Sequence, residues 1–375
     1  MKIAVNTRLL LRGKLDGIGW FTHEIVSRIV KAHPEHEFHF LFDRPYDKAF
    51  IFSSNVHAHV VSPQAKHPLL FRIWYNWMIP RKLKQIGADI FISLDTMASL
   101  RTNCKQIVVI HDLNFEHYPE DLPGHISRYF RSQTPLVADK VDSIITVSEF
   151  SKTDIIEQYG VQPTKIHVVC NAAQSSYRVL NEHERQEVRD EWTEGAPYFI
   201  FISSIHPRKN LQRLLLAYDQ FRRESGQDVK LLAVGRRFWK NESLDSTLKE
   251  MQFGNDVIFT GHLEQAALCR ALGAALSVVY VSYFEGFGVP IVEAFQSGVP
   301  VITSNVTSMP EVAGGAAMLV DPFDANDIAR AMLSVFQDEE TRTNLVEKGL
   351  ERAQQFSWEQ SAIDLWNVVE HTTRM

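Results

Sequence analysis

Short β-branched segments alternate with longer amphipathic segments along almost the whole chain, and the alternation is interrupted once, between residues 171 and 195. A strand followed by a helix, repeated several times, is the pattern of a parallel sheet with helices on both faces. Because the pattern restarts after the interruption, we expect an α/β protein with two Rossmann-like doubly wound domains that face each other across a cleft. A chain of 375 residues is also too long for one ordinary core.

Each half of the chain carries five predicted strands, which are short and apolar, as is typical of strands buried on both faces. Helical periodicity lies between them, for example over residues 19–33 and 210–224. We expect domains over 1–175 and 176–355, and a final helix over 356–375 that packs back toward the first domain. The strands are expected at 2–7, 37–42, 89–94, 106–112 and 143–148, and then at 198–204, 229–235, 256–261, 276–282 and 300–304.

The composition narrows the classes of protein to which the chain can belong. Its net charge of −6 argues against general nucleic-acid binding. No apolar run approaches the roughly 18 residues of a membrane span, and the start MKIAVNTRLL lacks the long apolar region of a signal peptide. Its three cysteines have no paired spacing, which argues against a disulfide framework or a zinc site. We therefore expect a cytoplasmic protein.

Ligands of open α/β sheets bind at the carboxyl ends of the strands, so the residues that follow each predicted strand are candidates for a site. In the first domain, Gly17 and Gly19 of DGIGW allow the backbone to approach a ligand at a helix start, although a plain tight turn explains them equally well. His111 and Asp112 follow another strand and are candidates for hydrogen bonds to substrate hydroxyls. From this stretch alone, a histidine that caps a loop is the better interpretation.

In the second domain, the segment ISSIHPRKN at 202–210 places Arg208 and Lys209 at the start of a predicted helix. A helix start already carries partial positive charge, so an anion should offset these two cations. We favour a diphosphate over a solvated basic turn. Ser204 lies in the same segment and is a further candidate contact.

The segment EGFGVPIVE at 285–293 forms a predicted bend and helix start after a strand. Glu285 would project from the bend. Glu293 would lie in the first helical turn, where a carboxylate can accept two hydrogen bonds from a ribose diol. The glycines at 286 and 288 indicate a close approach of the backbone to a ligand, which argues against two unrelated surface glutamates.

The sequence carries no motif for a bound metal or for a covalent nucleophile. It lacks G-x-x-x-x-G-K-[ST], H-E-x-x-H, G-x-S-x-G and Asp-x-Asp. We therefore expect no metal and no other cofactor. Arg208, Lys209 and backbone N–H groups would then offset the charge on a leaving diphosphate.

Together, DGIGW, VIHDLNF, TVSEFSKTDI, the PRKN turn and EGFGVPIVEAFQSGVPVITSNVTSMPEVAGGAA resemble family 4 retaining glycosyltransferases of the GT-B fold. The resemblance covers essentially the whole chain and is most specific over residues 282–322. It implies a retaining, metal-independent hexosyltransferase of the mannosyltransferase-like group 1 kind. Such an enzyme moves a sugar from a nucleoside diphosphate sugar to a glycan or lipid-linked acceptor in cell-surface polysaccharide synthesis. GDP-mannose is the favoured donor, ahead of UDP-linked sugars.

The resemblance also implies a role for each candidate residue. Glu293 would bind the ribose hydroxyls and Glu285 the transferred sugar, while Arg208 and Lys209 would hold the diphosphate. His111 would lie near the reacting centre. Backbone contacts to the donor are implied for Gly17, Gly19, Gly286, Phe287, Gly288 and Val289.

The implied mechanism needs no side-chain nucleophile. The acceptor would attack the face that the diphosphate leaves, and a phosphate oxygen would take the acceptor's proton. The sequence supports this account because it shows no pair of carboxylates arranged as acid and nucleophile. One departure from the family pattern is that Asp16 stands where a glycine is usual.

The stretch LLFRIWYNWMIPRKLKQ at 69–85 combines aromatic and basic residues, and two interpretations are open. It would suit a peripheral contact of the N-terminal domain with the inner face of a membrane that carries a lipid-linked acceptor. Alternatively, the aromatics pack as a helix face and the cations are solvated, which we favour. The residues concerned are Phe71, Trp74, Trp77 and Met78 with Arg72, Arg81, Lys82 and Lys84.

Two other functions fit parts of the pattern. A phosphorylase or a nucleotide-sugar epimerase would keep the GT-B fold and change the reaction, but a pyridoxal-phosphate phosphorylase should be much longer and carry a cofactor lysine. A two-lobed nucleotide-sugar-binding module without turnover is the alternative from another class. The presence of Arg208, Lys209, Glu285 and Glu293 argues against such a module.

Overall fold

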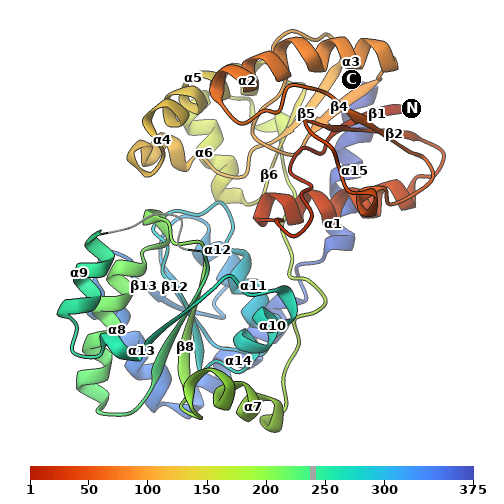
Figure 1. The fold of residues 1–375 in the computed structure, drawn as a ribbon. Helices are drawn as coiled ribbons and strands as arrows, with labels where there is room; N and C mark the ends of the chain where they lie inside the picture. The colour runs from red at the N-terminus through yellow and green to blue at the C-terminus, as the bar shows by residue number, and fades with distance from the viewer. Residues whose placement is uncertain (237–241) are drawn as a thin grey trace. The chain divides into compact units, whose positions relative to one another are not determined.

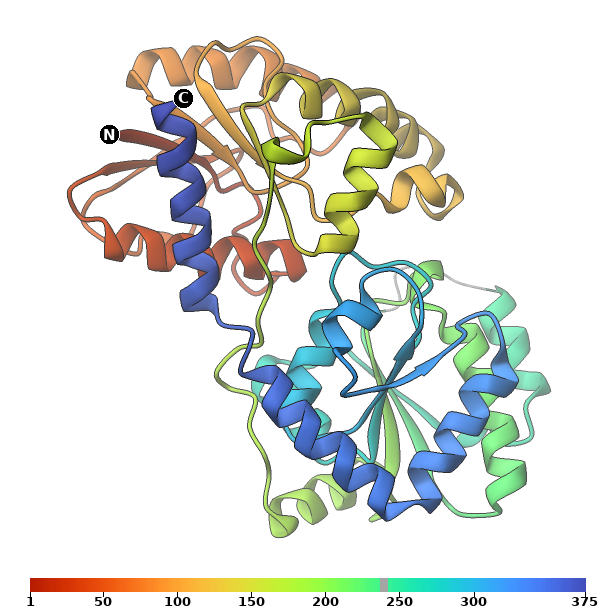
Figure 2. The same cartoon turned by 180° about the vertical axis from the view of Figure 1, so that it is seen from behind.

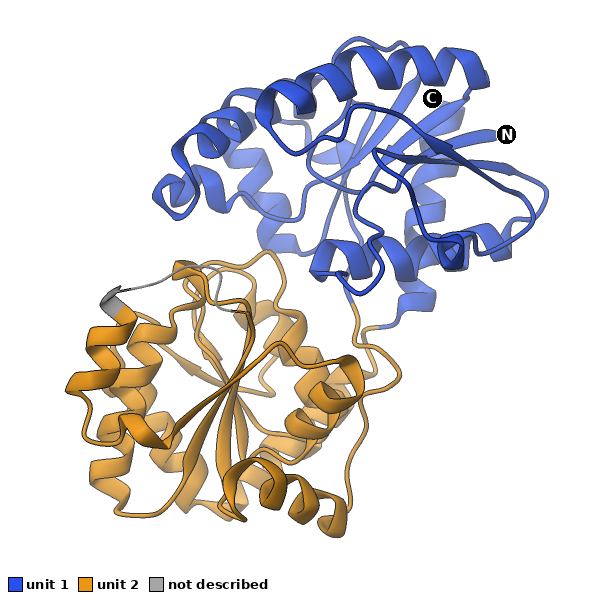
Figure 3. Cartoon of the chain, in the orientation of Figure 1, with its two compact units in different colours: residues 1–171, 357–375 blue, residues 172–356 orange. Residues whose placement is uncertain are grey.

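The structure is a computed structural model that describes residues 1–236 and 242–375. Within these residues the chain divides into two compact units (Figure 3). Unit 1 consists of residues 1–171 and 357–375, and unit 2 consists of residues 172–356. Each unit contains a parallel sheet with helices on both faces (Figure 1). The predicted pair of Rossmann-like doubly wound domains is therefore confirmed.

The described part of unit 1 has a seven-stranded parallel sheet in the order β3-β2-β1-β4-β5-β6-β7. The strand order reverses between β1 and β4, which makes the carboxyl ends of these two strands the switch point of the sheet. The strands are β1 (Lys2–Asn6), β2 (Glu37–Phe42), β3 (Val56–Val60), β4 (Ile90–Ser93), β5 (Lys105–Val109), β6 (Ser143–Thr146) and β7 (Ile166–Val168). The helices are α1 (Gly17–Ala32), α2 (Pro68–Ile73), the π-helix η2 (Trp74–Met78), α3 (Ile79–Ile86), α4 (Asn114–His117), α5 (Gly124–Lys140), α6 (Glu149–Tyr159) and α15 (Trp358–Arg374), with short 3₁₀ turns η1 (Lys48–Phe50), η3 (Pro119–Asp121) and η4 (Pro163–Lys165).

The last helix, α15, packs on unit 1 although it follows unit 2 in the sequence (Figure 2). Lys105 at the start of β5 donates from Nζ to the carbonyl oxygens of Thr372 and Thr373, each at 3.0 Å. The ring of Trp366 stacks on His33, which caps the C-terminal end of α1, with ring centroids 3.6 Å apart. These contacts fix the end of the chain to both β5 and α1.

The described part of unit 2 has a six-stranded parallel sheet in the order β10-β9-β8-β11-β12-β13. Its core is built from apolar side chains of β8, β9 and β11 against α8 and α13. The strands are β8 (Tyr198–Ile202), β9 (Lys230–Val234), β10 (Val257–Gly261), β11 (Ser277–Tyr280), β12 (Val301–Ser304) and β13 (Met318–Val320). The helices are α7 (Glu182–Thr193), α8 (Leu211–Ser225), α9 (Glu242–Glu250), α10 (Gln265–Gly273), α11 (Val289–Gln296), α12 (Met309–Ala313), α13 (Ala325–Gln337) and α14 (Glu339–Ala353), with 3₁₀ turns η5 (Pro207–Lys209) and η6 (Gly254–Asp256).

Two local predictions were wrong. Arg208 and Lys209 do not open the helix after β8, because they lie in the separate turn η5. Asn210, in the left-handed conformation with φ 61, separates this turn from the start of α8. Glu293 does not lie in the first turn of α11, which begins at Val289, but in the second. Three strands were also missed, namely β3, β7 and β13, of which two have only three residues and the third reads VHAHV.

Three histidines meet at the edge of the unit 1 sheet. His39 on β2 pairs in register with His57 on the edge strand β3, and His39 Nδ1 lies 3.0 Å from His59 Nε2. Burial of His59, and then the charges of Lys82 and the two neighbouring histidines, lower its pKa to about 4. In the unfolded chain the pKa of a histidine is about 6.5. Between about pH 4 and pH 6.5 the ring of His59 is therefore neutral in the folded protein and charged in the unfolded chain.

We expect this cluster to make the protein acid-sensitive. Since the folded pKa of His59 lies below its unfolded value, its contribution to stability is present above about pH 6.5 and is lost as the pH falls toward 4. Allowing for solvent screening at a half-buried site, the free energy of unfolding should fall by about 1–2 kcal/mol between pH 7.5 and pH 5 through this group. Urea unfolding of His59→Gln should show a correspondingly smaller loss. The exposed His183, replaced by glutamine, is the control, and parallel curves for all three proteins would contradict the expectation.

Candidate active site

The switch point of unit 2 lies between β8 and β11, where the strand order reverses. The turn after β8 carries Arg208 and Lys209, and the loop after β11 carries Glu285. Lys209 Nζ forms an ion pair with Glu285 Oε1, and Arg208 Nη1 lies 3.5 Å from Glu285 Oε2. The structure thus brings three predicted site residues together, and the carboxylate that offsets the two cations is Glu285.

The three charges are shielded from solvent. Glu285 is 5% exposed, and the side chains of Arg208 and Lys209 are 24% and 11% exposed. Burial acts to raise the pKa of the Glu285 carboxyl, but the charges of Lys209 and Arg208 outweigh it and hold that pKa at about 2. The three side chains together carry one net positive charge, which suits an anionic ligand.

Hydrogen bonds hold the basic turn to the loop after β11. Asn210, in the left-handed conformation that asparagine tolerates, donates from Nδ2 to the carbonyl oxygens of Val281 at 2.9 Å and Pro322 at 2.6 Å. The carbonyl of Arg208 accepts from the N–H of Tyr283 at 3.0 Å. Lys209 Nζ also donates to the Tyr280 hydroxyl at 3.0 Å. The two cations are therefore positioned by unit 2 itself.

The loop that carries Glu285 is fixed by Ser308, which lies after β12 at the start of α12. Ser308 Oγ donates to the carbonyl oxygens of Glu285 at 2.9 Å and Phe287 at 3.0 Å. Gly288, with φ 103, turns the chain into α11 at Val289. The Phe287 side chain is 4% exposed and packs edge-on against Phe356, so it serves the core. The predicted backbone contacts from Gly286 to Val289 stay a prediction.

Two residues lie at the carboxyl ends of strands next to this cluster. Ser204, predicted as a contact, is exposed after β8. Gly235 follows β9 with φ 148, and a Cβ at this position would lie 1.8 Å from the carbonyl oxygen of Ser203. Gly235 was not predicted from the sequence. Its signal was the glycine that ends the strand segment VKLLAVG.

Glu293 has surroundings that differ from those of Glu285. It is half-buried in α11, and among the described residues it forms no ion pair. Burial raises the pKa of its carboxyl to about 7. The hydroxyl of Tyr177 is its polar neighbour. The pKa values of the two glutamates of the segment EGFGVPIVE are thus shifted in opposite directions, because among the described residues cations lie beside Glu285 and not beside Glu293.

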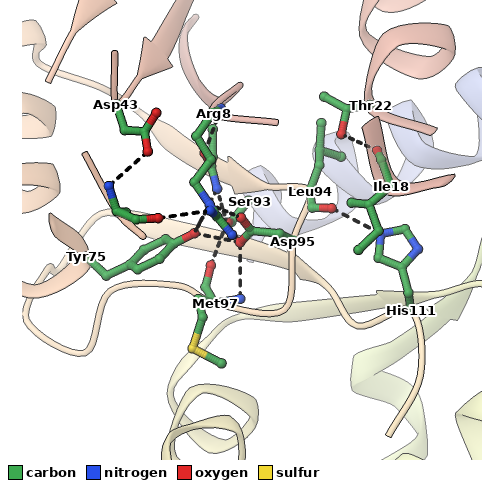
Figure 4. A network of polar contacts seen from close by, with 12 residues as sticks. Arg8, Ile18, Thr22, Asp43, Tyr75, Ser93, Leu94, Asp95, Met97 and His111 are labelled. Atoms are coloured by element: carbon green, nitrogen blue, oxygen red, sulfur yellow. Dashed lines mark hydrogen bonds and ion pairs between the residues drawn. The ribbon is translucent and has the colours of Figure 1, made fainter. Parts of the chain in front are cut away.

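In unit 1, His111 lies after β5 with its Nε2 3.1 Å from the carbonyl oxygen of Leu94 (Figure 4). A carbonyl can only accept, so Nε2 carries the proton and Nδ1 is left as an acceptor. Burial lowers the pKa of His111, which keeps the ring neutral near pH 7. Asp112 accepts a hydrogen bond from the N–H of Asn114 at 3.1 Å. It therefore stabilises the turn that leads into α4.

A polar network at the switch point of unit 1 was not predicted. Arg8 after β1 forms an ion pair with Asp95 after β4, and the buried Tyr75 hydroxyl donates to Asp95 Oδ1 at 2.6 Å (Figure 4). Asp95 Oδ1 also accepts from the N–H of Met97 at 3.3 Å. The network fixes the loop in which Leu94 accepts from His111. Its signal in the sequence was a charged residue soon after each of the two strands.

Gly17 and Gly19 form the first turn of α1, and Asp16 caps it by accepting from the N–H of Gly19 at 3.0 Å. A Cβ at Gly19 would lie 3.1 Å from the carbonyl oxygen of Leu9, whereas one at Gly17 would meet nothing within 4 Å. The departure from the family pattern at Asp16 therefore has a structural reason. The contacts of both glycines with a donor stay predictions.

No group of three or more His, Cys, Asp or Glu side chains in 1–236 and 242–375 is arranged to hold a metal ion. None of the helices in these ranges has the length and apolar content needed to cross a bilayer.

Comparisons with known proteins identify the family of the chain. A family model described as "Glycosyl transferases group 1" matches residues 182–352, and one described as "Glycosyltransferase Family 4" matches residues 15–175. The O-antigen chain mannosyltransferase B of Escherichia coli is 30% identical over 372 residues, which cover 96% of this chain and 97% of that protein. The serotype-specific mannosyltransferase WbdA of Escherichia coli is 28% identical over 69% of this chain, which matches 32% of that longer protein.

Among solved structures, HepE of Anabaena in complex with UDP and glucose superposes with a TM-score of 0.77 at 18% sequence identity. The match covers 99% of this chain and 100% of that chain. At this identity the likeness establishes the fold, which is the two-domain GT-B fold.

Proposed function

The chain belongs to the group 1 and family 4 glycosyltransferases, and we propose that it transfers mannose from GDP-mannose to a growing cell-surface glycan. Sugar transfer in polysaccharide synthesis follows from the family and from the full-length similarity to an O-antigen chain mannosyltransferase. That similarity is also the observation that carries the choice of mannose, because it extends over nearly the whole of both chains.

The donor's diphosphate binds at the switch point of unit 2 in this proposal. Arg208 bridges phosphate oxygens, and Lys209 supplies a point charge. Glu285, with a pKa of about 2, stays ionised and can only accept hydrogen bonds, so it binds hydroxyl groups of the transferred sugar. Glu293 accepts hydrogen bonds from the ribose. No metal is required, since the protein's own cations offset the charge that develops on the leaving diphosphate.

The same cluster supports a retaining mechanism without a covalent intermediate. A carboxylate that is held by two cations is a weak nucleophile, because its negative charge is already stabilised in the ground state. The acceptor therefore attacks on the face that the diphosphate leaves, and a phosphate oxygen takes its proton. Trapping of a glycosyl adduct on Glu285 or Asp112 would overturn this mechanism.

His111 contributes from unit 1 through its unprotonated Nδ1. Because Nε2 donates to Leu94, Nδ1 can accept a hydrogen bond from a hydroxyl of the transferred sugar. His111 would orient the transferred sugar at the reacting centre. We therefore expect its replacement to lower kcat.

A peripheral membrane contact of unit 1 is a further proposal. The structure buries Phe71 and Trp74 in the core, as the helix-packing interpretation predicted, but leaves Leu69 and Trp77 62% and 59% exposed. The basic residues Arg72, Arg81 and Lys84 are exposed on the same helical segment, which suits an anionic lipid surface. Flotation with anionic vesicles tests the contact, and recovery of the protein away from the vesicles would contradict the proposed membrane contact.

The donor base can be tested by thermal unfolding. At a nucleotide concentration one hundred times Kd, binding adds about 2.7 kcal/mol to stability. For a unit of this size the transition should rise by about 5–10 °C. We expect GDP to give this rise at a lower concentration than UDP. Guanosine should raise the unfolding temperature less than GDP does at the same concentration. A larger shift with UDP would contradict the proposed donor, and no shift with any nucleoside diphosphate would contradict the proposed site.

A further inference from the structure

Tyr177 is held rigidly beside helix α11. Gln296 on α11 donates from Nε2 to the carbonyl oxygens of Gln174 and Tyr177, each at 2.8 Å. From α10, Cys269 Sγ lies 3.4 Å from the hydroxyl of Ser176. Glu293 and Gln296 are three residues apart on α11 and therefore share one face of this helix. The segment that carries Tyr177 is thus fixed against the face that carries Glu293.

The hydroxyl of Tyr177 is buried without a hydrogen bond of normal geometry. The residue is 2% exposed, and among the described residues no group completes a hydrogen bond of normal geometry with this hydroxyl, although the side chains of Gln265 and Glu293 lie beside it. Leaving a buried hydroxyl unpaired costs free energy of folding, so such a group needs an explanation. Other buried tyrosines of unit 2 are paired, since the hydroxyls of Tyr198 and Tyr218 donate to the carbonyl oxygens of Ala271 at 2.5 Å and Val229 at 2.8 Å.

We propose that the Tyr177 hydroxyl is a hydrogen-bond donor for the ionised carboxylate of Glu293 in the nucleotide-bound state, which makes Tyr177 a positioning residue of the ribose subsite. The proposal rests on the proposed function, which assigns the ribose to Glu293. Two ribose hydroxyls donate to the carboxylate oxygens, and the phenol supplies a third hydrogen bond from the protein side. An uncharged donor is needed there because no described cation faces Glu293.

Burial determines the protonation states of Glu293, Tyr177 and Cys269. Burial raises the pKa values of Glu293, Tyr177 and Cys269, so near neutral pH the phenol and the thiol are neutral and the carboxyl is partly protonated. Nucleotide binding selects the ionised carboxylate, and the proton leaves to solvent. Affinity should therefore decrease as the pH falls below about 7, since Glu293 must then give up a proton to bind.

Tyr177→Phe tests the proposal, with GDP and UDP as probes in titration calorimetry. The variant should be at least as stable as the wild type, because it removes a buried hydroxyl that makes no hydrogen bond of normal geometry in the unbound protein. Its affinity for the nucleotide should nevertheless fall by about tenfold at pH 7, the size expected for a hydrogen bond to a charged group. Loss of the donor also raises the pKa of Glu293, so the decrease of affinity with falling pH should begin at a higher pH. Removal of the ribose hydroxyls, with a 2′,3′-dideoxynucleoside diphosphate, should abolish the difference between the two proteins.

Tyr198→Phe is the matched control, because it loses a buried hydrogen bond in the same unit. It should lower stability and leave affinity unchanged. Equal affinity of Tyr177→Phe and the wild type at all pH values, with weaker binding by Glu293→Ala, would overturn the role of Tyr177 alone. Unchanged affinity of Glu293→Ala would overturn the ribose assignment itself, and a Tyr177→Phe protein less stable than wild type would show that the hydroxyl has a structural partner.

Discussion

Replacement of Lys209 by alanine is expected to lower kcat/KM for the donor sugar by about 10²–10³-fold, the size of effect seen when one preorganised group that stabilises developing charge is removed. Lys209 is largely buried, and its ammonium is held by Glu285 and Tyr280. Nothing therefore has to reorganise when negative charge appears on the leaving diphosphate. The loss should appear in steady-state kinetics both as a higher KM for the donor and as a lower kcat.

A matched control distinguishes this effect from general damage to unit 2. Lys230 is also largely buried and forms ion pairs with Asp228 and Asp256, but it begins β9 and so lies at the amino end of the sheet. Lys230→Ala should cost stability without lowering kcat/KM in folded protein. Similar kinetic losses in the two variants would contradict the assignment of Lys209 to the diphosphate.

Replacement of His111 by alanine is expected to lower kcat by about 10–100-fold, the cost of leaving a buried hydroxyl without its acceptor. The donor KM should change little, because the diphosphate and the nucleoside are bound by unit 2 in this account. The ring is neutral and its proton is fixed on Nε2 by Leu94, so the rate should not depend on charging of this histidine above about pH 7. Single-turnover measurements at saturating donor report the chemical step directly.

His167 provides the control for His111. It lies on β7 of the same unit, and burial lowers its pKa as it does for His111, but its ring packs against His371 of α15. His167→Ala should therefore leave kcat unchanged. If His111→Ala raised only the donor KM, His111 would serve binding and not the reacting centre.

The fold could be predicted from the sequence to the extent that its strands are buried on both faces. Segments such as YFIFISS and LSVVYVS show this directly, and the doubly wound architecture follows from their alternation with helices. The edge strand β3, which reads VHAHV, was missed because it is partly exposed and is not apolar at every position, as a strand buried on both faces would be. The three-residue strands β7 and β13 were missed because they are too short to show a period.

The candidate site could be predicted only where its residues share a short motif. Arg208, Lys209 and Glu285 lie in recognisable turns, and the structure joins them, but their mutual ion pairs depend on the packing of β8 beside β11. The network of Arg8, Tyr75 and Asp95 comes from three distant segments, so no spacing reveals it. The raised pKa of Glu293 was hidden for the same reason, since it arises from burial.

The central claim is that the basic turn after β8 binds a nucleoside diphosphate with the protein's own cations. Titration calorimetry in EDTA, with GDP and guanosine as ligands for the wild type and Lys209→Ala, measures this most directly. We predict that GDP binds the wild type equally well with and without EDTA. We also predict that Lys209→Ala lowers the affinity for GDP by at least about tenfold and leaves the affinity for guanosine unchanged. Loss of GDP binding in EDTA, or the same loss for GDP and guanosine in the variant, would contradict the claim.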